Sequence, residues 1–379
     1  MTAIEVPQVS PRQKHVREFD WMMLAVVALC CLGLVMAVSV LGPNSRLGPM
    51  RAIKQQGIEL LIGLVGFILA AVTPMHLMRR LALPGFVLIG LACWSTRFIA
   101  VPWNHAYRWI QIGSFQFQPV EGAKFALVIL VAHLLAKAGR EVFTFRHGFL
   151  PVMGAVAFLA GGLMLQPDHG SALLAITIAA AMALVAGVRV RHFIVWCGGL
   201  GLPLFVYLGM QHGYVTGRVQ NFLDIKPDSQ VGQSLVAIAS GGVFGRGLGE
   251  GWMKMGFVAE ADSDFVFSVI AEELGFCGSM LVLSLYSVFG IACYCLIGRI
   301  QDSFLRFVVC GFAFLLLGQA TINLLVVSGC VPAKGIDLPF VSTGGTSLFF
   351  CLAAVGVMGN AARTDLSGSP KISASSRSV

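Results

Sequence analysis

Charge is scarce in this sequence. The chain has 26 Lys and Arg and 18 Asp and Glu, which together make up 12% of its 379 residues, whereas about 25% is usual in a soluble domain. Hydrophobic residues account for 57%, and the mean hydropathy is +0.82. So few charged side chains cannot cover a water-facing surface, and the composition therefore predicts a polytopic membrane protein.

Several motifs of other protein classes are absent. There is no Walker A sequence, no Gly-x-Ser-x-Gly elbow and no His-Glu-x-x-His pair, which argues against nucleotide-driven transport and the common hydrolases. The 10 cysteines lie mainly in or beside apolar runs and show no zinc-binding spacing. Basic residues are scattered rather than gathered in a stripe. We therefore expect no nucleotide, haem or zinc cofactor and no nucleic-acid partner.

Apolar runs recur along the chain, and a helix that spans a bilayer needs about 20 such residues. Because lipid offers no hydrogen-bonding partners, each run is expected to form a helix that satisfies its own backbone. The sequence thus predicts an all-α polytopic integral membrane protein with about ten transmembrane helices. The expected spans are 21–41, 57–73, 81–95, 119–136, 149–165, 171–188, 193–210, 265–297, 307–328 and 345–362.

The distribution of Lys and Arg predicts the orientation of these spans. Basic residues favour the cytoplasmic side, and the short loops on the side of the two termini are the richer in them, which favours an N-in, C-in topology. The expected parts are a cytoplasmic segment at 1–20, one transmembrane domain at 21–363, a disordered cytoplasmic tail at 364–379 and outer loops at about 96–118, 211–263 and 329–344. The first two loops contain aromatic residues that suit short interfacial helices, namely Trp103, Trp109 and Phe222.

Some polar residues lie where apolar ones are expected. Glu121 and Lys124 share a helix face at i and i+3 in the fourth span, where they form either a structural ion pair or part of a substrate site. Gln319 and Asn323 are interpreted as hydrogen-bonding glue between helices. Asp168, in a Pro-Asp turn before the sixth span, suits a helix N-cap and, without conflict, a carboxylate that faces a cavity.

The densest acidic cluster precedes the eighth span. Asp262 or Ser263 is expected to cap that helix, which would place Asp264 in its first turn, where the helix dipole favours a carboxylate. Glu272 and Glu273 follow within the helix. Asp262-x-Asp264 is similar to the metal-binding pair of some glycosyltransferases, since two carboxylates and a substrate diphosphate can hold Mg²⁺. A solvated acidic loop is the simpler interpretation.

Several motifs follow one another along nearly the whole chain. They are Tyr107-Arg108-Trp109-Ile110 with Gln118-Pro119-Val120-Glu121 and Lys124; Gln166-Pro167-Asp168-His169-Gly170; Gln230, Gln233 and Ser234 with the glycine-rich stretch 241–249; Asp264-Phe265 with Glu272-Glu273-Leu274-Gly275; and Asn323, Pro332, Lys334-Gly335, Leu338-Pro339-Phe340, Ser342 and Gly344-Gly345. In this order they resemble the SEDS family (shape, elongation, division and sporulation) of bacterial ten-span membrane proteins. Lys334 before Gly335 is more similar to its division-type members than to its elongation-type members.

The resemblance implies a function. A chain that resembles this family is expected to be a peptidoglycan glycosyltransferase. Such an enzyme polymerises lipid II by inverting transfer and releases undecaprenyl diphosphate. The division type serves septal cell wall synthesis. Its expected partners are a class B penicillin-binding protein, which is a transpeptidase, and other division or elongation machinery. The expected location is the bacterial inner membrane, with the active site on the extracytoplasmic face.

The same resemblance implies roles for individual residues. Asp264 aligns with the residue regarded as catalytic, and together with Asp262 it would supply ligands for Mg²⁺ or another divalent cation. Substrate-binding roles are expected for Arg108, Trp109, Gln118, Glu121, Lys124, Asp168, Gln230, Gln233, Lys334 and Ser342.

The sequence also departs from the family pattern. Asp262 stands where a His is usual, Ala259 replaces a Pro, Val120 replaces a Ser and Thr343 replaces a Tyr. Two other functions therefore stay open. Intramembrane charges and spans interrupted by Gly and Pro are also typical of a flippase or transporter for lipid II, and the changes near Asp264 would suit a non-catalytic scaffold for a penicillin-binding protein.

Overall fold

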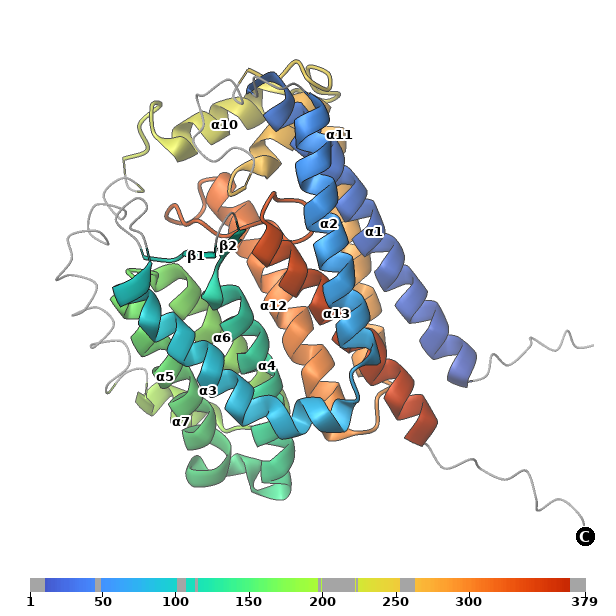
Figure 1. The fold of residues 1–379 in the computed structure, drawn as a ribbon, viewed down its shortest axis with the longest axis vertical. Coiled ribbons are helices and arrows are strands. Elements are labelled where there is room, and N and C mark those ends of the chain that lie inside the picture. The colour runs from blue at the N-terminus through green and yellow to red at the C-terminus, as the bar shows by residue number, and fades with distance from the viewer. Residues whose placement is uncertain are drawn as a thin grey trace, which may run out of the picture.

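The computed structural model describes residues 11–44, 49–100, 107–112, 115–196, 199, 222, 224–252 and 263–368. Within these residues, nine helices are long and apolar enough to cross a membrane, and they form a bundle (Figure 1). They are α1 (Pro11–Asn44), α2 (Pro49–Val72), α3 (Met75–Ile99), α4 (Pro119–Ala138), α5 (Leu150–Leu165), α6 (His169–Ala186), α11 (Val266–Ile297), α12 (Ser303–Val327) and α13 (Gly345–Gly368). The predicted all-α polytopic membrane fold is confirmed.

Shorter elements lie between the spans. A 3₁₀ turn and a π-helical turn join α4 to α5, and a short α-helix follows α6. Another helix, α10, packs on the end of α12, where the Ser234 hydroxyl donates a 2.8 Å hydrogen bond to the carbonyl of Val327. The bounds of these elements are Gly139–Phe143, Phe145–Phe149, α7 (Val190–Trp196) and α10 (Gln230–Ser240), with the strands β1 (Ile110–Ile112) and β2 (Phe115–Phe117).

Nine of the ten predicted spans coincide with these helices. The remaining one, the seventh predicted span at 193–210, falls largely outside the described residues. The third span is longer than predicted, because α3 begins at Met75 and keeps Pro84 inside the helix. The apolar run stops at a basic pair, but the long side chain of Arg79 reaches the ring of Phe304, 5.4 Å from its centroid. Such side chains let a helix continue past its apolar core.

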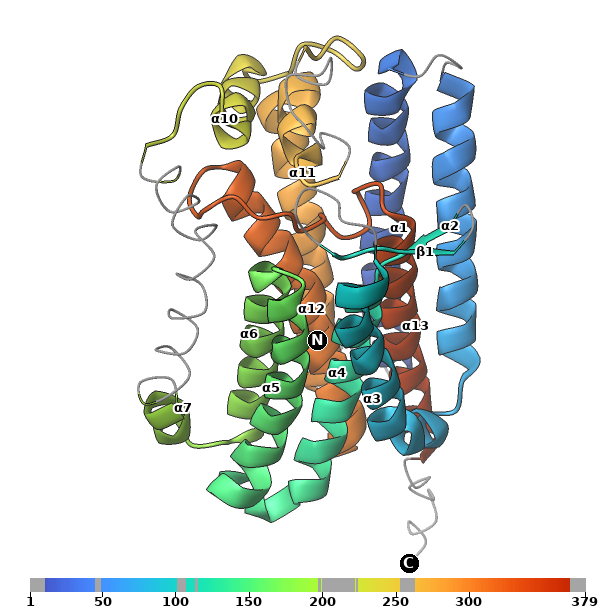
Figure 2. The same cartoon turned by 60° about the vertical axis from the view of Figure 1, so that its left-hand side comes forward.

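The described part of the connection between α3 and α4 forms a small sheet rather than the predicted interfacial helices. β1 and β2 pair antiparallel, with Ile110 opposite Phe117. Apolar residues alternate with Gln111 and Gln116 in the two strands, which is the period of a strand, although segments of 3 residues give only a weak signal. The Thr346 hydroxyl donates a 3.1 Å hydrogen bond to the carbonyl of Gln116, so the hairpin lies against the start of α13 (Figure 2).

The interior of the bundle is built around α12 and α13. Helix α12 contacts α4, α6, α11 and α13, while α2 lies along α13 and α1 lies along α11 (Figure 2). Helices α2 and α13 pack closely because Gly66 has no side chain. A Cβ atom there would lie only 2.7 Å from the ring of Phe349. At the far end of α2, the Asn360 amide donates to the carbonyls of Ala70 (3.1 Å) and Thr73 (2.6 Å), which satisfies groups that the helix leaves without partners.

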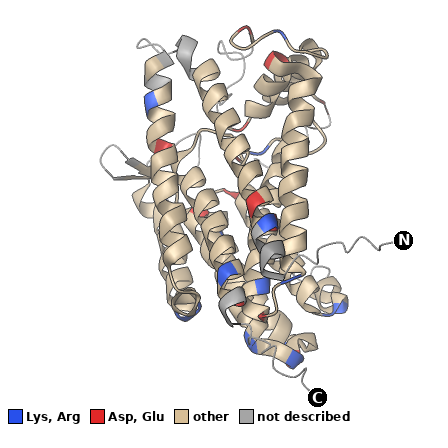
Figure 3. Cartoon of the chain, turned by 90° about the vertical axis from the view of Figure 1, so that its right-hand side faces the viewer, with Lys and Arg blue, Asp and Glu red and all other residues tan. Residues whose placement is uncertain are grey.

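The two ends of the bundle differ in charge. Lys and Arg gather at the end where α13 finishes (Figure 3), where Arg299 also forms an ion pair with Glu18. We call this the basic end and the opposite one, where α11 starts, the site end. Helix α13 runs to Gly368, so the first residues of the predicted disordered tail are helical, and 369–379 lie outside the described residues.

Candidate active site

Asp264 lies half-buried in a turn just before α11, at the site end of the bundle. The helix begins at Val266, and its N-cap residue Phe265 makes no side-chain capping bond. The prediction that Ser263 caps this helix, with Asp264 in its first turn, is therefore wrong. The alternative cap, Asp262, lies outside the described residues. The turn takes this shape because side chains from other segments hold its backbone carbonyls.

Two of those side chains come from α12 and from the last outer loop. Asn323 on α12 donates from Nδ2 to the carbonyl of Asp264 at 2.8 Å and to that of Ile336 at 2.7 Å. Ser342 donates to the carbonyl of Ser263 at 2.6 Å and accepts from the amide of Leu338 at 2.8 Å. The predicted hydrogen-bonding role of Asn323 is thus found, but its bonds join α12 to two loop carbonyls rather than to another helix.

The segment between these two anchors brings Lys334 and Gly335 to the site. A Cβ atom at Gly335 would lie 2.7 Å from Oδ2 of Asp264, so only glycine allows this approach. A Cβ atom at Gly170 would lie 3.3 Å from Cδ of Lys334 and 3.6 Å from Oδ1 of Asp168. The side chain of Lys334 therefore passes close to Asp168, while its neighbour touches Asp264.

Asp168 caps α6 as predicted. Its carboxylate accepts from the Ser171 amide at 3.2 Å and from the Ser171 hydroxyl at 2.8 Å. Although this side chain is only 6% exposed, Oδ2 also lies 3.6 Å from Nε of Arg108. The cap therefore carries a charge that faces a cation, which combines the two roles expected of Asp168.

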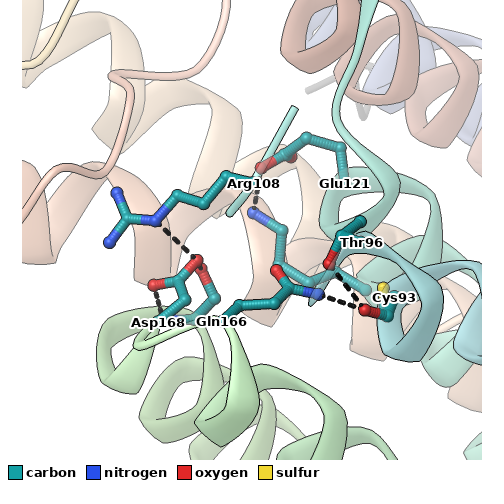
Figure 4. A network of polar contacts seen from close by, with 8 residues as sticks. Cys93, Thr96, Arg108, Glu121, Gln166 and Asp168 are labelled. Carbon is teal, nitrogen blue, oxygen red and sulfur yellow. Dashed lines mark hydrogen bonds and ion pairs between the residues drawn. The ribbon is translucent and has the colours of Figure 1, made fainter. Parts of the chain in front are cut away.

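Glu121 and Lys124 form the predicted pair on α4, with 2.7 Å between Oε1 and Nζ. Both are buried, at 7% and 3% exposure. Figure 4 shows Arg108 extending from beside Glu121 toward Asp168. The first outer connection thereby adds Arg108 to the charged groups at this end of the bundle, with Asp168 as its ion-pair partner.

Gln166 fixes the position of the Asp168 turn, a role that the sequence did not indicate. Its amide donates a 2.6 Å hydrogen bond to the carbonyl of Cys93 on α3, and the Thr96 hydroxyl donates to the same oxygen at 2.8 Å (Figure 4). Gln166 is 1% exposed. The signal available was a Gln directly before the Pro-Asp turn, which does not reveal a partner on another helix.

The remaining predicted substrate contacts lie around this centre. Trp109 is half-buried immediately before β1, whereas Trp103 lies outside the described residues. Gln118 precedes the first turn of α4 and makes no capping bond. On α10, Gln230 is exposed at the first position and Gln233 is half-buried one turn later. Their substrate-binding roles stay predictions.

The expected metal site can be compared with the donors present. In the part of the chain that the structure describes, no group of three or more His, Cys, Asp or Glu side chains is arranged to hold a metal ion. Asp262, the second expected ligand, lies outside that part. The described donors around Asp264 therefore do not form a cation site of three or more such ligands.

The arrangement has a clear chemical capacity. Asp264 is a carboxylate fixed by its own backbone, which suits a group that accepts a proton from a bound hydroxyl. Lys334 and Arg108 are cations within the same end of the bundle, which suits an anionic substrate group. The fold and the site together define an integral membrane protein with a carboxylate and two cations at one end of its bundle.

Comparison with known proteins gives the family. Residues 20–366 match the family model FTSW_RODA_SPOVE, described as cell cycle protein. The chain belongs to this family, and the SEDS resemblance is confirmed. A curated relative from Trichlorobacter lovleyi, named probable peptidoglycan glycosyltransferase FtsW, is 35% identical over 90% of this chain and 93% of its own length.

Two solved structures are similar over nearly the whole fold. One, titled as the structural coordination of polymerization and crosslinking by a peptidoglycan synthase complex, has a TM-score of 0.74 and 29% identity, and covers 91% of this chain and 97% of that one. The other is the rod shape determining protein RodA of Thermus thermophilus, with a TM-score of 0.68, 28% identity, and coverage of 90% and 95%.

Proposed function

We propose that this protein is a peptidoglycan glycosyltransferase that polymerises lipid II during septal cell wall synthesis. The 4-hydroxyl of one lipid-linked disaccharide attacks the anomeric carbon of another chain. A glycosidic bond forms with inversion, the bond from that carbon to the diphosphate breaks, and undecaprenyl diphosphate leaves. Asp264 accepts the proton of the attacking hydroxyl. The observation that carries the proposal is the turn of Asp264, held through backbone carbonyls by Asn323 and Ser342.

The leaving group requires positive charge nearby. Lys334 lies one residue from Gly335, which touches Asp264, and its side chain passes the Asp168 turn that Arg108 faces. Cations fixed at this place stabilise charge as it develops on a departing diphosphate. Lys124 is already paired with Glu121 at 2.7 Å, so we assign the diphosphate to Lys334 and Arg108 first.

The orientation follows from the charges at the two ends. Lys and Arg gather at the basic end (Figure 3), which supports a cytoplasmic location for that end. The site end then lies on the extracytoplasmic face of the bacterial inner membrane, where glycan strands are assembled. The similar peptidoglycan synthase complex supports a crosslinking partner, which we propose to be a class B penicillin-binding protein.

The test is polymerisation of purified lipid II by the purified full-length protein, with and without the partner and with and without a chelator. Asp264→Asn should lower the rate by at least about 100-fold, the usual contribution of a positioned acid or base. Glu141→Gln, which changes an exposed carboxylate in the 3₁₀ turn after α4, is the matched control and should keep the wild-type rate. An Asp264→Asn protein that polymerises at full rate would overturn the assignment.

The buried pair on α4 favours a second candidate. Charges inside a bundle are typical of transporters, and Glu121 with Lys124 is such a pair. A flippase would move fluorescent lipid II across liposomes without forming polymer, and the loss of that movement in Glu121→Gln would support it. Polymer formed by the wild-type protein and abolished by Asp264→Asn would favour the transferase instead.

A further inference from the structure

Helix α11 is broken at Gly275, farther toward the outer tip of the site end than Asp264. Gly275 has φ 68° and ψ −158°, a backbone conformation essentially restricted to glycine. The break separates an upper segment, Val266–Leu274, from the rest of the span. A helix interrupted in this way loses backbone hydrogen bonds on both sides of the interruption, and near a membrane those groups need other partners.

The outer loop 241–252, here called the docking loop, supplies these partners from its own backbone. Two of its amides donate to carbonyls of residues before the break, and two of its carbonyls accept from amides of residues after it. The four bonds are Arg246 N to Glu272 O (3.0 Å), Gly247 N to Glu273 O (3.0 Å), Phe276 N to Gly242 O (2.9 Å) and Cys277 N to Val243 O (3.1 Å). The docking loop therefore completes the helix.

Glu273 reinforces this contact with its side chain, which is fully buried. The Ser39 hydroxyl on α1 is 2.7 Å from its Oε1 and 2.6 Å from its Oε2. The amide of Gly249 in the docking loop donates to Oε2 at 3.2 Å. One carboxylate thus joins α1, the docking loop and the upper segment of α11.

Glu272 makes a second set of contacts with the same loop. It is 1% exposed, and its Oε1 accepts from the amide of Trp252 at 2.9 Å. The Arg246 guanidinium lies 3.8 Å from Oε1 and stacks over the Trp252 ring at 5.0 Å. Because buried carboxylates are costly without donors, each glutamate requires the docking loop to be in place.

The upper segment is therefore anchored at both ends. At its start, Asn323 and Ser342 hold the carbonyls of Asp264 and Ser263. At its end, Glu272 and Glu273 hold it to the docking loop at the outer tip of the bundle. We infer that Glu272 and Glu273 are positioning residues that set the location of Asp264 relative to Lys334. This inference rests on the proposed function, because it assigns the outer anchor of the segment that follows Asp264.

The test compares Glu273→Ala, Glu272→Ala and the isosteric Glu273→Gln in the full-length protein, with Glu141→Gln, an exposed glutamate in the 3₁₀ turn after α4, as the matched control. Polymerisation is measured over a range of lipid II concentrations. The alanine variants should lower kcat by about 10- to 100-fold, as expected for a reacting group displaced by about 1 Å, and leave KM within about twofold. Glu273→Gln should recover part of kcat, because its amide oxygen still accepts from Gly249 or Ser39.

Hydrogen exchange measured by mass spectrometry gives a readout independent of activity. In the alanine variants, peptides that cover 241–252 and 264–277 should exchange faster, while peptides of α12 should not change. Wild-type kcat together with faster exchange in these peptides would overturn the positioning role, and so would a loss confined to KM. Ser39→Ala removes a single contact and should show a smaller change of the same kind, if the alanine variants do not fold.

The two failures are distinguishable. Full polymerisation by Asp264→Asn would remove the proposed function, whatever Glu273 does. If Asp264→Asn is inactive but both alanine variants keep wild-type kcat, the proposed function stands and the positioning role of Glu272 and Glu273 does not.

Discussion

The two charged centres of this protein are built in different ways. Glu121 and Lys124 lie one turn apart on α4 and neutralise each other at 2.7 Å. Asp264 lies on a turn whose backbone is held by residues 59 and 79 positions further along the chain. The first centre is complete within one helix, while the second exists only when distant segments meet. The difference shows that the α4 ion pair can form from local spacing alone, whereas the position of Asp264 depends on the tertiary fold.

The largest effect is expected at the local centre. Lys124→Met removes the cation that pairs with the buried Glu121 carboxylate. It should lower the free energy of unfolding by about 3–5 kcal/mol. The double variant Glu121→Gln with Lys124→Met should recover most of this loss, because neither buried charge remains. Thermal unfolding in detergent measures both.

The control for this change is Lys137→Met, an exposed lysine on the same helix, which should alter stability little. If Lys124→Met is no less stable than Lys137→Met, the pair on α4 does not behave as a buried ion pair.

The next effect should be confined to the Asp264 centre. Gly335→Ala puts a methyl group 2.7 Å from Oδ2 of Asp264, which displaces the carboxylate or the loop that carries Lys334. We expect kcat/KM for lipid II polymerisation to fall by about 100-fold with a nearly unchanged melting temperature. Gly85→Ala on α3, where a Cβ atom meets nothing within 4 Å, is the control. Equal polymerisation rates for Gly335→Ala and Gly85→Ala would show that a methyl group at residue 335 does not disturb Asp264.

The smallest effect should come from Asp168→Asn, which separates the two roles of this residue. Asn caps a helix as well as Asp does, so stability should change by less than about 1 kcal/mol. The attraction to Arg108 is lost, and polymerisation should slow by several-fold.

Asp302→Asn makes the same change at the α12 cap, where the carboxylate accepts from the Leu305 amide at 2.9 Å, at the basic end. It should leave both stability and rate nearly unchanged. A large loss of stability in Asp168→Asn alone would mean that its charge mainly holds the fold.

The sequence allowed prediction wherever a signal is local. Long apolar runs locate the spans, a spacing of three residues places Glu121 beside Lys124, and a Pro-Asp turn predicts the cap at Asp168. Prediction failed where a partner is distant. Nothing near residue 323 says that its amide reaches the Asp264 turn, and the first-turn position expected for Asp264 was wrong because local capping rules ignore such partners.

The family resemblance supplied what local rules could not. It indicated that Asp264, Lys334 and Ser342 matter together, although no periodicity relates them. It did not indicate the short hairpin before α4, because two strands of 3 residues carry little pattern. The hairpin also has a distant partner, since Thr346 on α13 donates a hydrogen bond to the carbonyl of Gln116.

The distance in sequence between Asp264 and its anchors also bears on biosynthesis. A chain is made and inserted from its N-terminus, so the Asp264 turn emerges well before α12 and the last outer loop. Until Asn323 and Ser342 have crossed into place, the carboxylate has no fixed position next to Lys334. A nascent or C-terminally truncated chain therefore lacks the bonds that fix the Asp264 turn, and under the proposed function we expect it to polymerise only once the final helices are in place.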